Sequence, residues 1–489
     1  MRRTKIVCTL GPSSHDLETI VGLVKAGMDV ARLNFSHGTH DDHRRYFEAV
    51  REAARESGKV VAVMADLQGP KIRTGSLEDG GPVTLVPGAS ICITTRDVPG
   101  SAACVPTTYE SLPGDVTPGD RLLLADGMLE LSVSNVSGPD VHCTVTRGGL
   151  LGEHKGINLP GVPVSAEPLT GKDIEDLDFA LELGVDYIAL SFVRAAGDIV
   201  HLKERIASAG HETPVVAKIE RPEAVENIDA ILDVTDAVMV ARGDLGVEME
   251  LDEVPQLQKE IISKCNHHGV PVITATQMLE SMISSVRPTR AEAADVANAI
   301  HDGTDALMLS GETAIGHFPI EAVATMARIA FKTDLVLECA VRRGPDVPGE
   351  HFDKVDEGEE ATFAHVIGHA ASYCAESVDA RCITCFTMSG YSARMISRCR
   401  PCKPLVAITM NETTRRKCAM YWGVQAVLGT ETDNLNKMLT QVDDTLTREG
   451  FAEIGDTVII VAGTPLLIGG RTNMLKIHRL GEENTKIGE

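Results

Sequence analysis

Short runs of apolar, mostly β-branched residues alternate with longer amphipathic stretches over the first 335 residues or so of the chain. Eight of these runs read as buried strands, at residues 5–10, 29–33, 60–66, 186–190, 215–219, 237–240, 272–275 and 306–309. Parallel strands need crossover connections, so strands that alternate with helices predict a parallel sheet. Eight strand–helix units predict that this sheet closes into a (β/α)8 barrel, the TIM-barrel architecture.

The alternation is interrupted once, between residues 70 and 167. Helical periodicity gives way there to Gly, Pro and period-two patterns, for example at residues 83–86, 91–95 and 121–124. This pattern predicts a small, all-β domain, a β-barrel, inserted after the third barrel strand. The barrel itself then consists of residues 1–69 and 168–340.

A second series of α/β units begins near residue 345. It contains a predicted helix at residues 362–377 and predicted strands at 382–386, 405–409, 426–428 and 457–461. We therefore expect a separate C-terminal α/β domain over residues 345–489; a regulatory role for it is implied only by the resemblance described below.

Composition narrows the class of protein. The 489 residues carry a formal net charge of -24, which argues against a general nucleic-acid surface and against attraction to anionic membranes. No apolar run approaches the ~20 residues that span a bilayer, and the apolar run near the N-terminus is too short for a signal sequence. We expect a cytoplasmic protein with reduced thiols.

Two CxxC pairs, Cys382 with Cys385 and Cys399 with Cys402, raise the alternative of a zinc site. The first pair falls inside a predicted strand, where positions i and i+3 point to opposite faces. A zinc knuckle needs a turn between its cysteines, so this pattern favours free thiols over zinc.

Polar side chains follow seven of the eight predicted barrel strands. In chain order they are Arg32, Asn34, Ser36 and His37, then Asp66, Lys71 and Arg73, then Ser191, then Lys218 and Glu220, then Arg242, Gly243 and Asp244, then Thr276 and Gln277, and finally Ser310, Gly311 and Glu312. Barrel enzymes carry their active sites at the C-terminal ends of the strands. This density of arginines and acids predicts an active site rather than a set of solvated turns.

The residue types indicate the chemistry. Glu220 and Asp244 are hard oxygen ligands suited to Mg²⁺ or Mn²⁺. Arg32, Arg73 and Lys218 are three cations that suit a multiply charged phosphate. The chain contains no G-x-x-x-x-G-K-[ST] loop and no kinase-type glycine-rich loop, so a standard nucleotide cradle is missing.

Two neutral hydroxyls and a glycine turn complete the predicted mouth. Thr276 and Ser310 could hold a water molecule or relay a proton. The turn around Gly243 can present backbone N–H groups to a carboxylate.

Seven motifs spread along the chain resemble those of the pyruvate kinase family, in the same order. They lie at residues 27–38, 72–75, 155–161, 217–220, 239–246, 275–282 and 302–313. The resemblance implies a barrel, an inserted β domain and a C-terminal α/β domain. It implies transfer of the phosphoryl group of phosphoenolpyruvate to ADP, which gives pyruvate and ATP in the last step of glycolysis. It also implies an allosteric, cytoplasmic homotetramer.

The resemblance further implies roles for single residues. Arg32 and Arg73 hold the phosphoryl region, and Lys218 stabilises the transferring group and the enolate. Glu220 and Asp244 bind Mg²⁺.

In the same pattern the backbone at Gly243 and Asp244, together with Thr276, meets the substrate carboxylate. Thr276 and Ser310 lie on the proton path. The nucleotide lies near Asn34, His37, Arg73 and Lys155. Because Lys155 belongs to the inserted domain, that domain is expected to close as a lid that excludes water.

One position departs from the family pattern. Family members that need K⁺ carry an acidic residue two positions before the arginine that corresponds to Arg73, and here that position is Lys71. An ammonium group could replace K⁺ beside the predicted cation ligands Asn34, Ser36, Asp66 and Leu67. We therefore expect an enzyme that does not require K⁺. The alternative is that Lys71 turns into solvent.

A second site is expected at residues 386–394, where a strand, a hydroxyl-rich turn and a helix start follow one another. Thr387, Ser389 and Ser392 resemble the family's effector loop, which binds sugar phosphates or AMP. The loop lacks the lysine of some relatives, which argues against fructose 1,6-bisphosphate. The alternative is an ordinary helix cap, since Ser and Thr are also common there.

Two other classes of protein stay open. A metal-dependent barrel aldolase that acts on phosphoenolpyruvate or pyruvate shares the pair Glu220 and Asp244, but it needs neither the lid nor a nucleotide cluster. A metabolite sensor without turnover is expected to lack part of the catalytic set, whereas this sequence contains all of it.

Overall fold

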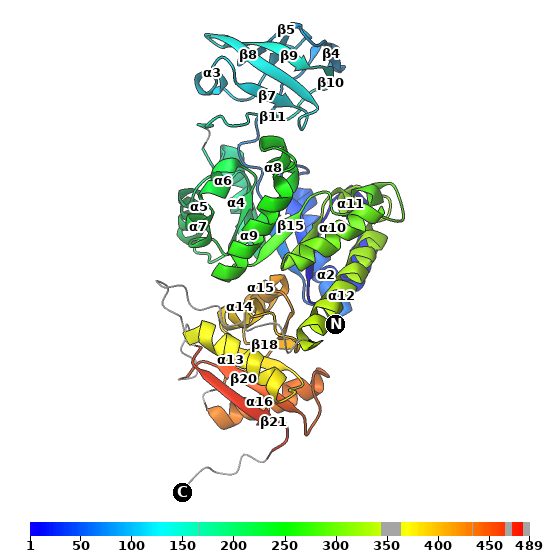
Figure 1. Cartoon of the computed structure of the whole chain (residues 1–489), viewed down its shortest axis with the longest axis vertical. Helices are drawn as coiled ribbons and strands as arrows, with labels where there is room; N and C mark the ends of the chain where they lie inside the picture. The colour runs from blue at the N-terminus through cyan, green and yellow to red at the C-terminus, as the bar shows by residue number, and fades with distance from the viewer. Residues whose placement is uncertain (166, 344–362, 433, 465–471, 483–489) are drawn as a thin grey trace.

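The computed structural model describes residues 1–165, 167–343, 363–432, 434–464 and 472–482. Three parts follow one another along its long axis (Figure 1). A closed barrel lies in the middle, the inserted β region lies at one end and the C-terminal α/β region at the other.

The barrel is a single closed sheet of eight parallel strands. Its strands are β1 (Lys5–Thr9), β2 (Val30–Asn34), β3 (Ala62–Asp66), β12 (Tyr187–Leu190), β13 (Val215–Ile219), β14 (Ala237–Ala241), β15 (Val272–Ala275) and β16 (Ala306–Leu309). They pair in the order β1-β16-β15-β14-β13-β12-β3-β2, so each strand pairs with its sequence neighbour and β1 closes on β16. All eight predicted strands are confirmed, with ends that differ by at most two residues.

The helices around the barrel begin and end at clear capping residues. Helix α1 (Leu17–Ala26) starts at Asp16, whose side chain accepts a hydrogen bond from the Thr19 N–H, and α2 (His40–Ser57) ends at Gly58 with φ +64°. These caps satisfy backbone groups that a helix end leaves unpaired. The remaining barrel helices are α4 (Gly171–Leu183), α5 (Ala196–Ser208), α6 (Pro222–Glu226), α7 (Ile228–Leu232), α8 (Arg242–Glu248), α9 (Val254–His268), α10 (Arg290–His301), α11 (Gly311–Ala314) and α12 (Pro319–Arg343).

Two apolar clusters share the barrel strands. The alternate residues that face outward, such as Ile188 and Leu190, pack against the helices. The residues that face inward, such as Val216 and Met239, form a second cluster, which continues into C-terminal residues such as Val424. The floor of the barrel is therefore packed directly on the C-terminal region.

The inserted region is built from β strands with one short helix. It contains β4 (Val83–Leu85), β5 (Ser90–Thr94), β6 (Cys104–Pro106), α3 (Leu112–Asp115), β7 (Arg121–Leu124), β8 (Leu129–Ser137), β9 (Asp140–Arg147), β10 (Gly149–Leu151) and β11 (Ile157–Asn158). Six strands pair in the order β11-β7-β8-β9-β5-β6, and β10 pairs with β4 in a separate sheet. The predicted small β-barrel is thus built from two sheets.

The C-terminal region forms a five-stranded sheet in the order β19-β18-β17-β20-β21. Its elements are α13 (Phe363–Ser377), β17 (Ile383–Phe386), α14 (Tyr391–Arg398), β18 (Leu405–Thr409), α15 (Glu412–Lys417), β19 (Val424–Leu428), α16 (Leu435–Arg448), β20 (Thr457–Ala462) and β21 (Met474–Arg479). Strand β21 was not predicted, because it is an antiparallel edge strand that alternates basic and apolar residues and is mostly accessible to solvent.

The cysteine pair of β17 points to opposite faces of this sheet, as the spacing predicts. Cys382 packs in the cluster that contains Val458 and Leu446, whereas Cys385 packs in the cluster that reaches the barrel floor. Within the described residues, no group of three or more His, Cys, Asp or Glu side chains could hold a metal ion.

The predicted domain limits stay predictions. The limit at residue 345 and the predicted helix start at residue 362 lie outside the described residues. In the part of the chain that the structure describes, no helix is long and apolar enough to cross a membrane.

Candidate active site at the barrel mouth

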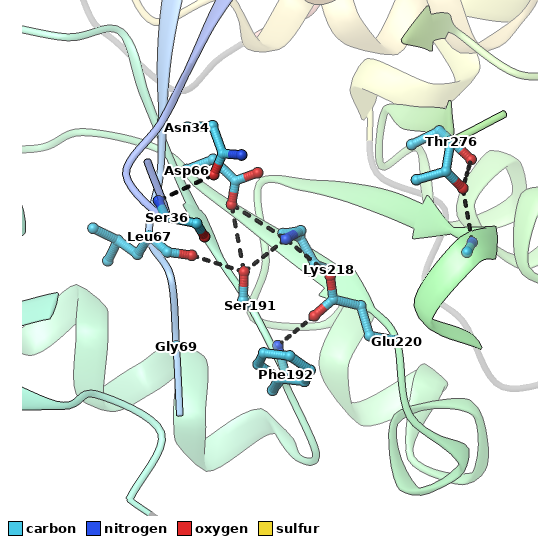
Figure 2. A network of polar contacts seen from close by, with 12 residues as sticks. Asn34, Ser36, Asp66, Leu67, Gly69, Ser191, Phe192, Lys218, Glu220 and Thr276 are labelled. Carbon is cyan, nitrogen blue, oxygen red and sulfur yellow. Dashed lines mark hydrogen bonds and ion pairs between the residues drawn. The ribbon is translucent and has the colours of Figure 1, made fainter. Parts of the chain in front are cut away.

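The centre of the site is the buried ammonium group of Lys218, near the end of β13. Its Nζ lies 2.8 Å from Glu220 Oε1 and 3.3 Å from Asp66 Oδ1, and it donates a hydrogen bond of 2.6 Å to Ser191 Oγ. Figure 2 shows these side chains converging from β3, β12 and β13. The C-terminal ends of three adjacent strands therefore meet on one cation.

Asp66 joins that cation to a second one. Its Oδ2 accepts a hydrogen bond of 2.6 Å from Arg32 Nε, and Arg32 Nη1 also donates to Thr9 Oγ1 at 3.0 Å. Burial alone would raise the pKa of Asp66, but Lys218 and Arg32 outweigh burial and hold that pKa below its ordinary value. The carboxylate stays ionised and fixes both cations at the mouth.

The charges of the cluster reinforce each other. Burial alone would lower the pKa of Lys218, but Asp66 and Glu220 outweigh it and raise that pKa above its ordinary value. Lys218 is therefore a charged donor and cannot act as a neutral base near neutral pH.

The pKa of Glu220 is raised above its ordinary value. Burial raises its pKa, Lys218 lowers it and the nearby Asp244 carboxylate raises it again. Its Oε2 accepts the Phe192 N–H at 2.7 Å. A divalent cation at Glu220 and Asp244 would offset this repulsion, and the two carboxylates supply the hard oxygen ligands that Mg²⁺ or Mn²⁺ prefers. The residues therefore fit such a metal.

Thr276 sits in a strained backbone conformation. Its φ is +70°, which is unusual for a β-branched residue and is found where the surroundings enforce it. Its Oγ1 accepts the Gly243 N–H at 2.7 Å (Figure 2). Arg242 contacts the same loop. Its Nη2 donates a hydrogen bond of 2.7 Å to the Thr276 carbonyl, and its Nη1 lies 2.8 Å from Asp295 Oδ2.

Ser310 contributes an uncommitted hydroxyl. Its backbone N–H donates to Glu312 Oε2 at 2.7 Å, whereas its Oγ is buried and has no hydrogen-bond partner within the described residues. Such a group is free to bind a water molecule. No hydrogen bond joins Ser310 to Thr276 in the described structure.

The predicted nucleotide residues come from two regions of the chain, the barrel and the inserted region. Arg73 Nη1 donates to the His154 carbonyl at 3.2 Å, and the backbone of the exposed Lys155 pairs with Thr74, so both belong to the inserted region. His37 lies at the barrel side, where burial, and then the charges of Arg73 and Lys71, lower its pKa. Asn34 Oδ1 accepts the Ser36 N–H at 3.2 Å.

The role of Lys71 as an internal cation stays a prediction. The two Asp66 oxygens are held by Arg32 and Lys218, and within the described residues no hydrogen bond or ion pair joins the Lys71 ammonium to Asn34, Ser36 or Asp66. Lys71 lines, together with Asp244, a narrow cleft of about 30 Å³ between the barrel and the inserted region. The Leu67 carbonyl is likewise engaged, by Ser191 Oγ at 2.7 Å.

The predicted effector loop leads from β17 into α14. Thr387 Oγ1 accepts the Gly390 N–H at 2.9 Å, and Ser392 Oγ lies 2.7 Å from Thr472 Oγ1. Ser389 is exposed between them. Two of the three predicted hydroxyls therefore already have partners within the protein.

Sequence reasoning placed Ser191 and Arg242 at the mouth but assigned them no role. The structure shows Ser191 joining Lys218, Asp66 and Leu67, and Arg242 holding the Thr276 loop. Their position directly after β12 and β14 was the available signal, since Glu220, Thr276 and Ser310 also directly follow barrel strands.

A closed parallel barrel with buried cations and two carboxylates at its C-terminal mouth defines a barrel enzyme that acts on an anionic substrate. A pyruvate kinase barrel-domain model matches residues 1–323, and a pyruvate kinase alpha/beta-domain model matches residues 365–478.

Individual relatives agree with these matches. The chain is 47% identical to a pyruvate kinase of Mycobacterium intracellulare, over 99% of both chains. It is 46% identical to a pyruvate kinase of Corynebacterium efficiens, over 99% of this chain and 98% of that one. A crystal structure of a pyruvate kinase from Cryptosporidium parvum superposes with a TM-score of 0.88 at 38% identity, over 98% of this chain and 96% of that one. The chain belongs to the pyruvate kinase family and is a phosphotransferase.

Proposed function

We propose that this chain transfers the phosphoryl group of phosphoenolpyruvate to ADP, giving pyruvate and ATP, with Lys218 as the central catalytic residue. The observation that carries this proposal is the buried ammonium held between Asp66, Glu220 and Ser191. Negative charge moves from the substrate phosphate to the departing enolate and to the nucleotide during transfer. A fixed cation in a desolvated site stabilises such charge far better than water does.

Arg32 assists Lys218 from β2, across the barrel mouth. Asp66 holds both cations, so the mouth presents two fixed positive groups to the phosphoryl oxygens. Charge-assisted hydrogen bonds from a guanidinium suit phosphate geometry. Arg73 approaches from the inserted region and completes this set once the lid closes.

Glu220 and Asp244 would hold the divalent metal ion, Mg²⁺ or Mn²⁺. When bound, the ion neutralises phosphate charge and helps to orient the substrate. The raised pKa of Glu220, which results from burial and from Asp244, supports this assignment.

The substrate carboxylate is proposed to bind at the Gly243–Asp244 backbone and the Thr276 hydroxyl. Arg242 keeps Thr276 in its strained conformation, so the hydroxyl is already placed before substrate arrives. After phosphoryl transfer, the enolate carbon takes up a proton to form pyruvate. The buried, unpartnered Ser310 hydroxyl, together with Thr276, would carry that proton through a water molecule.

The inserted region is proposed to close over ADP as a lid. Asn158 of β11 already donates a hydrogen bond of 2.9 Å to Glu248 of α8, the helix that carries Asp244. Closure would bring Lys155 and Arg73 toward Asn34 and His37, around the nucleotide. Exclusion of water then strengthens every charge interaction in the mouth.

Replacing Lys218 with Met should lower kcat about 10²- to 10³-fold, the usual loss on removing one donor to developing negative charge. The assay is ADP-dependent pyruvate formation from phosphoenolpyruvate with Mg²⁺. Lys264→Met is a matched control, since Lys264 pairs with the exposed Asp229, and should keep kcat within about twofold. Pyruvate formation that does not need ADP would favour the aldolase alternative, and a complete lack of turnover would favour the sensor.

We also propose that the enzyme works without K⁺. Both Asp66 oxygens already have cationic partners, and the Lys71 ammonium adds positive charge to the cleft shared with Asp244. In this proposal Lys71 need not itself occupy the cation site beside Asn34, Ser36, Asp66 and Leu67, as the sequence analysis expects.

Activity in a tetramethylammonium buffer should therefore stay close to activity in K⁺ at the same ionic strength. Lys71→Glu should introduce a K⁺ requirement, because a carboxylate there would need a counter-ion. Near-zero wild-type activity that K⁺ restores would refute the proposal.

Regulation is proposed to occur at the loop of Thr387, Ser389 and Ser392 through a phosphorylated activator, a sugar phosphate or AMP. The exposed Ser389 beside the start of α14 supports this assignment, since N–H groups at a helix N-terminus attract phosphate. A homotetramer in the cytoplasm is proposed on family resemblance.

At least one of AMP, glucose 6-phosphate, ribose 5-phosphate and fructose 1,6-bisphosphate should lower the phosphoenolpyruvate concentration for half-saturation. Ser389→Asp should abolish the shift given by AMP, glucose 6-phosphate or ribose 5-phosphate through charge repulsion, whereas Ser208→Asp, at an exposed position on α5, should preserve it. Unchanged saturation curves with all four compounds would show that the loop is an ordinary helix cap.

A further inference from the structure

A basic cleft separates the barrel from the C-terminal region on the side away from the active site. It lies between the last turns of α2, the start of β3 and helix α15, and it has a volume of about 430 Å³. Its charged lining residues are Arg51, Arg55, Lys59, Arg415, Arg416 and Glu412. The space is within the range of small-molecule sites.

The charge of this cleft runs against that of the whole protein. The chain carries a formal net charge of -24, yet five cationic side chains and one acidic side chain line the cleft. Two carboxylates that do not line the cleft pair with arginines that do: Asp186 with Arg51, and Glu52 with Arg55. The positive charges at the cleft still outnumber the negative ones. The carbonyl end of α2 adds only about half a negative charge.

One wall of the cleft is fixed. The buried Asp186 carboxylate accepts hydrogen bonds from Arg51 Nη2 at 2.8 Å and from Arg416 Nε at 2.7 Å. Two guanidinium groups thus share a single carboxylate. Burial, together with repulsion from Arg416, lowers the pKa of Arg51 despite the attraction of Asp186. A further anion would relieve this repulsion.

The rim of the cleft is adaptable. Arg55 pairs with Glu52 and Arg415 pairs with Glu412, each within one helical turn near the protein surface. Surface pairs of this kind contribute about 0 to 1 kcal/mol, so the exposed Arg55 can turn toward a ligand at little cost. Arg415 is more buried and also donates from Nε to the Ala426 carbonyl at 3.3 Å, so it would exchange that bond for one to a ligand. Arginine binds phosphate oxygens in a bidentate manner.

We infer that the cleft between α2 and α15 is a binding site for a small phosphorylated molecule, separate from the active site and from the loop at Ser389. Arg51 and Arg416 form its fixed wall, and Arg55 and Arg415 close on the phosphate. This assignment does not depend on the proposed catalytic roles, because it predicts binding in the absence of turnover.

Strand β12 connects this cleft with the active site. Asp186 directly precedes the strand, and the Tyr187 hydroxyl donates to the Lys417 carbonyl of α15 at 2.7 Å. Ser191 directly follows the strand and accepts a hydrogen bond from Lys218. A ligand that pulls Arg416 or α15 acts on the floor end of this four-residue strand. Binding in the cleft is therefore expected to change the affinity for phosphoenolpyruvate.

Calorimetric titration with fructose 1,6-bisphosphate in metal-free buffer tests the site directly. The full-length Ser389→Asp protein serves as the background, so that the loop cannot contribute. Adding Arg55→Gln and Arg415→Gln should weaken binding at least tenfold. Arg45→Gln is the matched control, since Arg45 forms a similar pair with Asp42 at the other end of α2, and it should leave binding unchanged.

Equal affinity with and without Arg55 and Arg415, or no measurable binding to the background protein, would overturn the site. Thermal unfolding of each variant excludes misfolding as the cause of a loss. In steady-state assays on the same background, the bisphosphate should shift half-saturation by phosphoenolpyruvate at least twofold, and the added substitutions should remove the shift. Binding without any shift would overturn the connection through β12.

Discussion

The active site depends on one buried carboxylate. Asp66, which is 1% exposed, holds Arg32 through one oxygen and Lys218 through the other. Without it, two cations from different barrel strands would repel each other in a desolvated pocket, where charge interactions are strong. With it, both are fixed and charged. Glu220 balances the second cation, and its own repulsion with Asp244 then favours a metal ion.

A similar arrangement, one buried carboxylate that holds two cations, occurs at the other end of the barrel. Asp186 is also 1% exposed and also holds two arginines, one from the barrel and one from the C-terminal region. Strand β12 lies between the two arrangements, and the inward-facing barrel cluster continues into the C-terminal sheet. Removing one partner of a buried ion pair typically costs about 3 to 5 kcal/mol. Asp186 therefore joins the barrel to the C-terminal region, whereas Asp66 joins side chains of separate strands within the barrel.

Much of this arrangement could be predicted from the sequence, because buried parallel strands are short apolar runs and barrel chemistry follows their C-terminal ends. The eight strands and the residues of the mouth were found in this way. The edge strand β21 was missed because its alternating basic residues lack that pattern. The position of Lys71 and the support of Thr276 by Arg242 depend on side-chain direction and on partners far apart in sequence, such as Asp295, which spacing alone does not reveal.

The central claim is that Asp66 acts through the cations that it holds, so that Asp66 and Lys218 form one unit. A double-mutant cycle in kcat for pyruvate formation tests this claim most directly, with Asp66→Asn, Lys218→Met and the combined variant. Residues that act as a unit give strongly non-additive losses. The account predicts that the combined loss is at least about tenfold smaller than the product of the two single losses, the remaining effect of Asp66→Asn being on Arg32. Losses that multiply would show that the two residues act independently and would contradict the account.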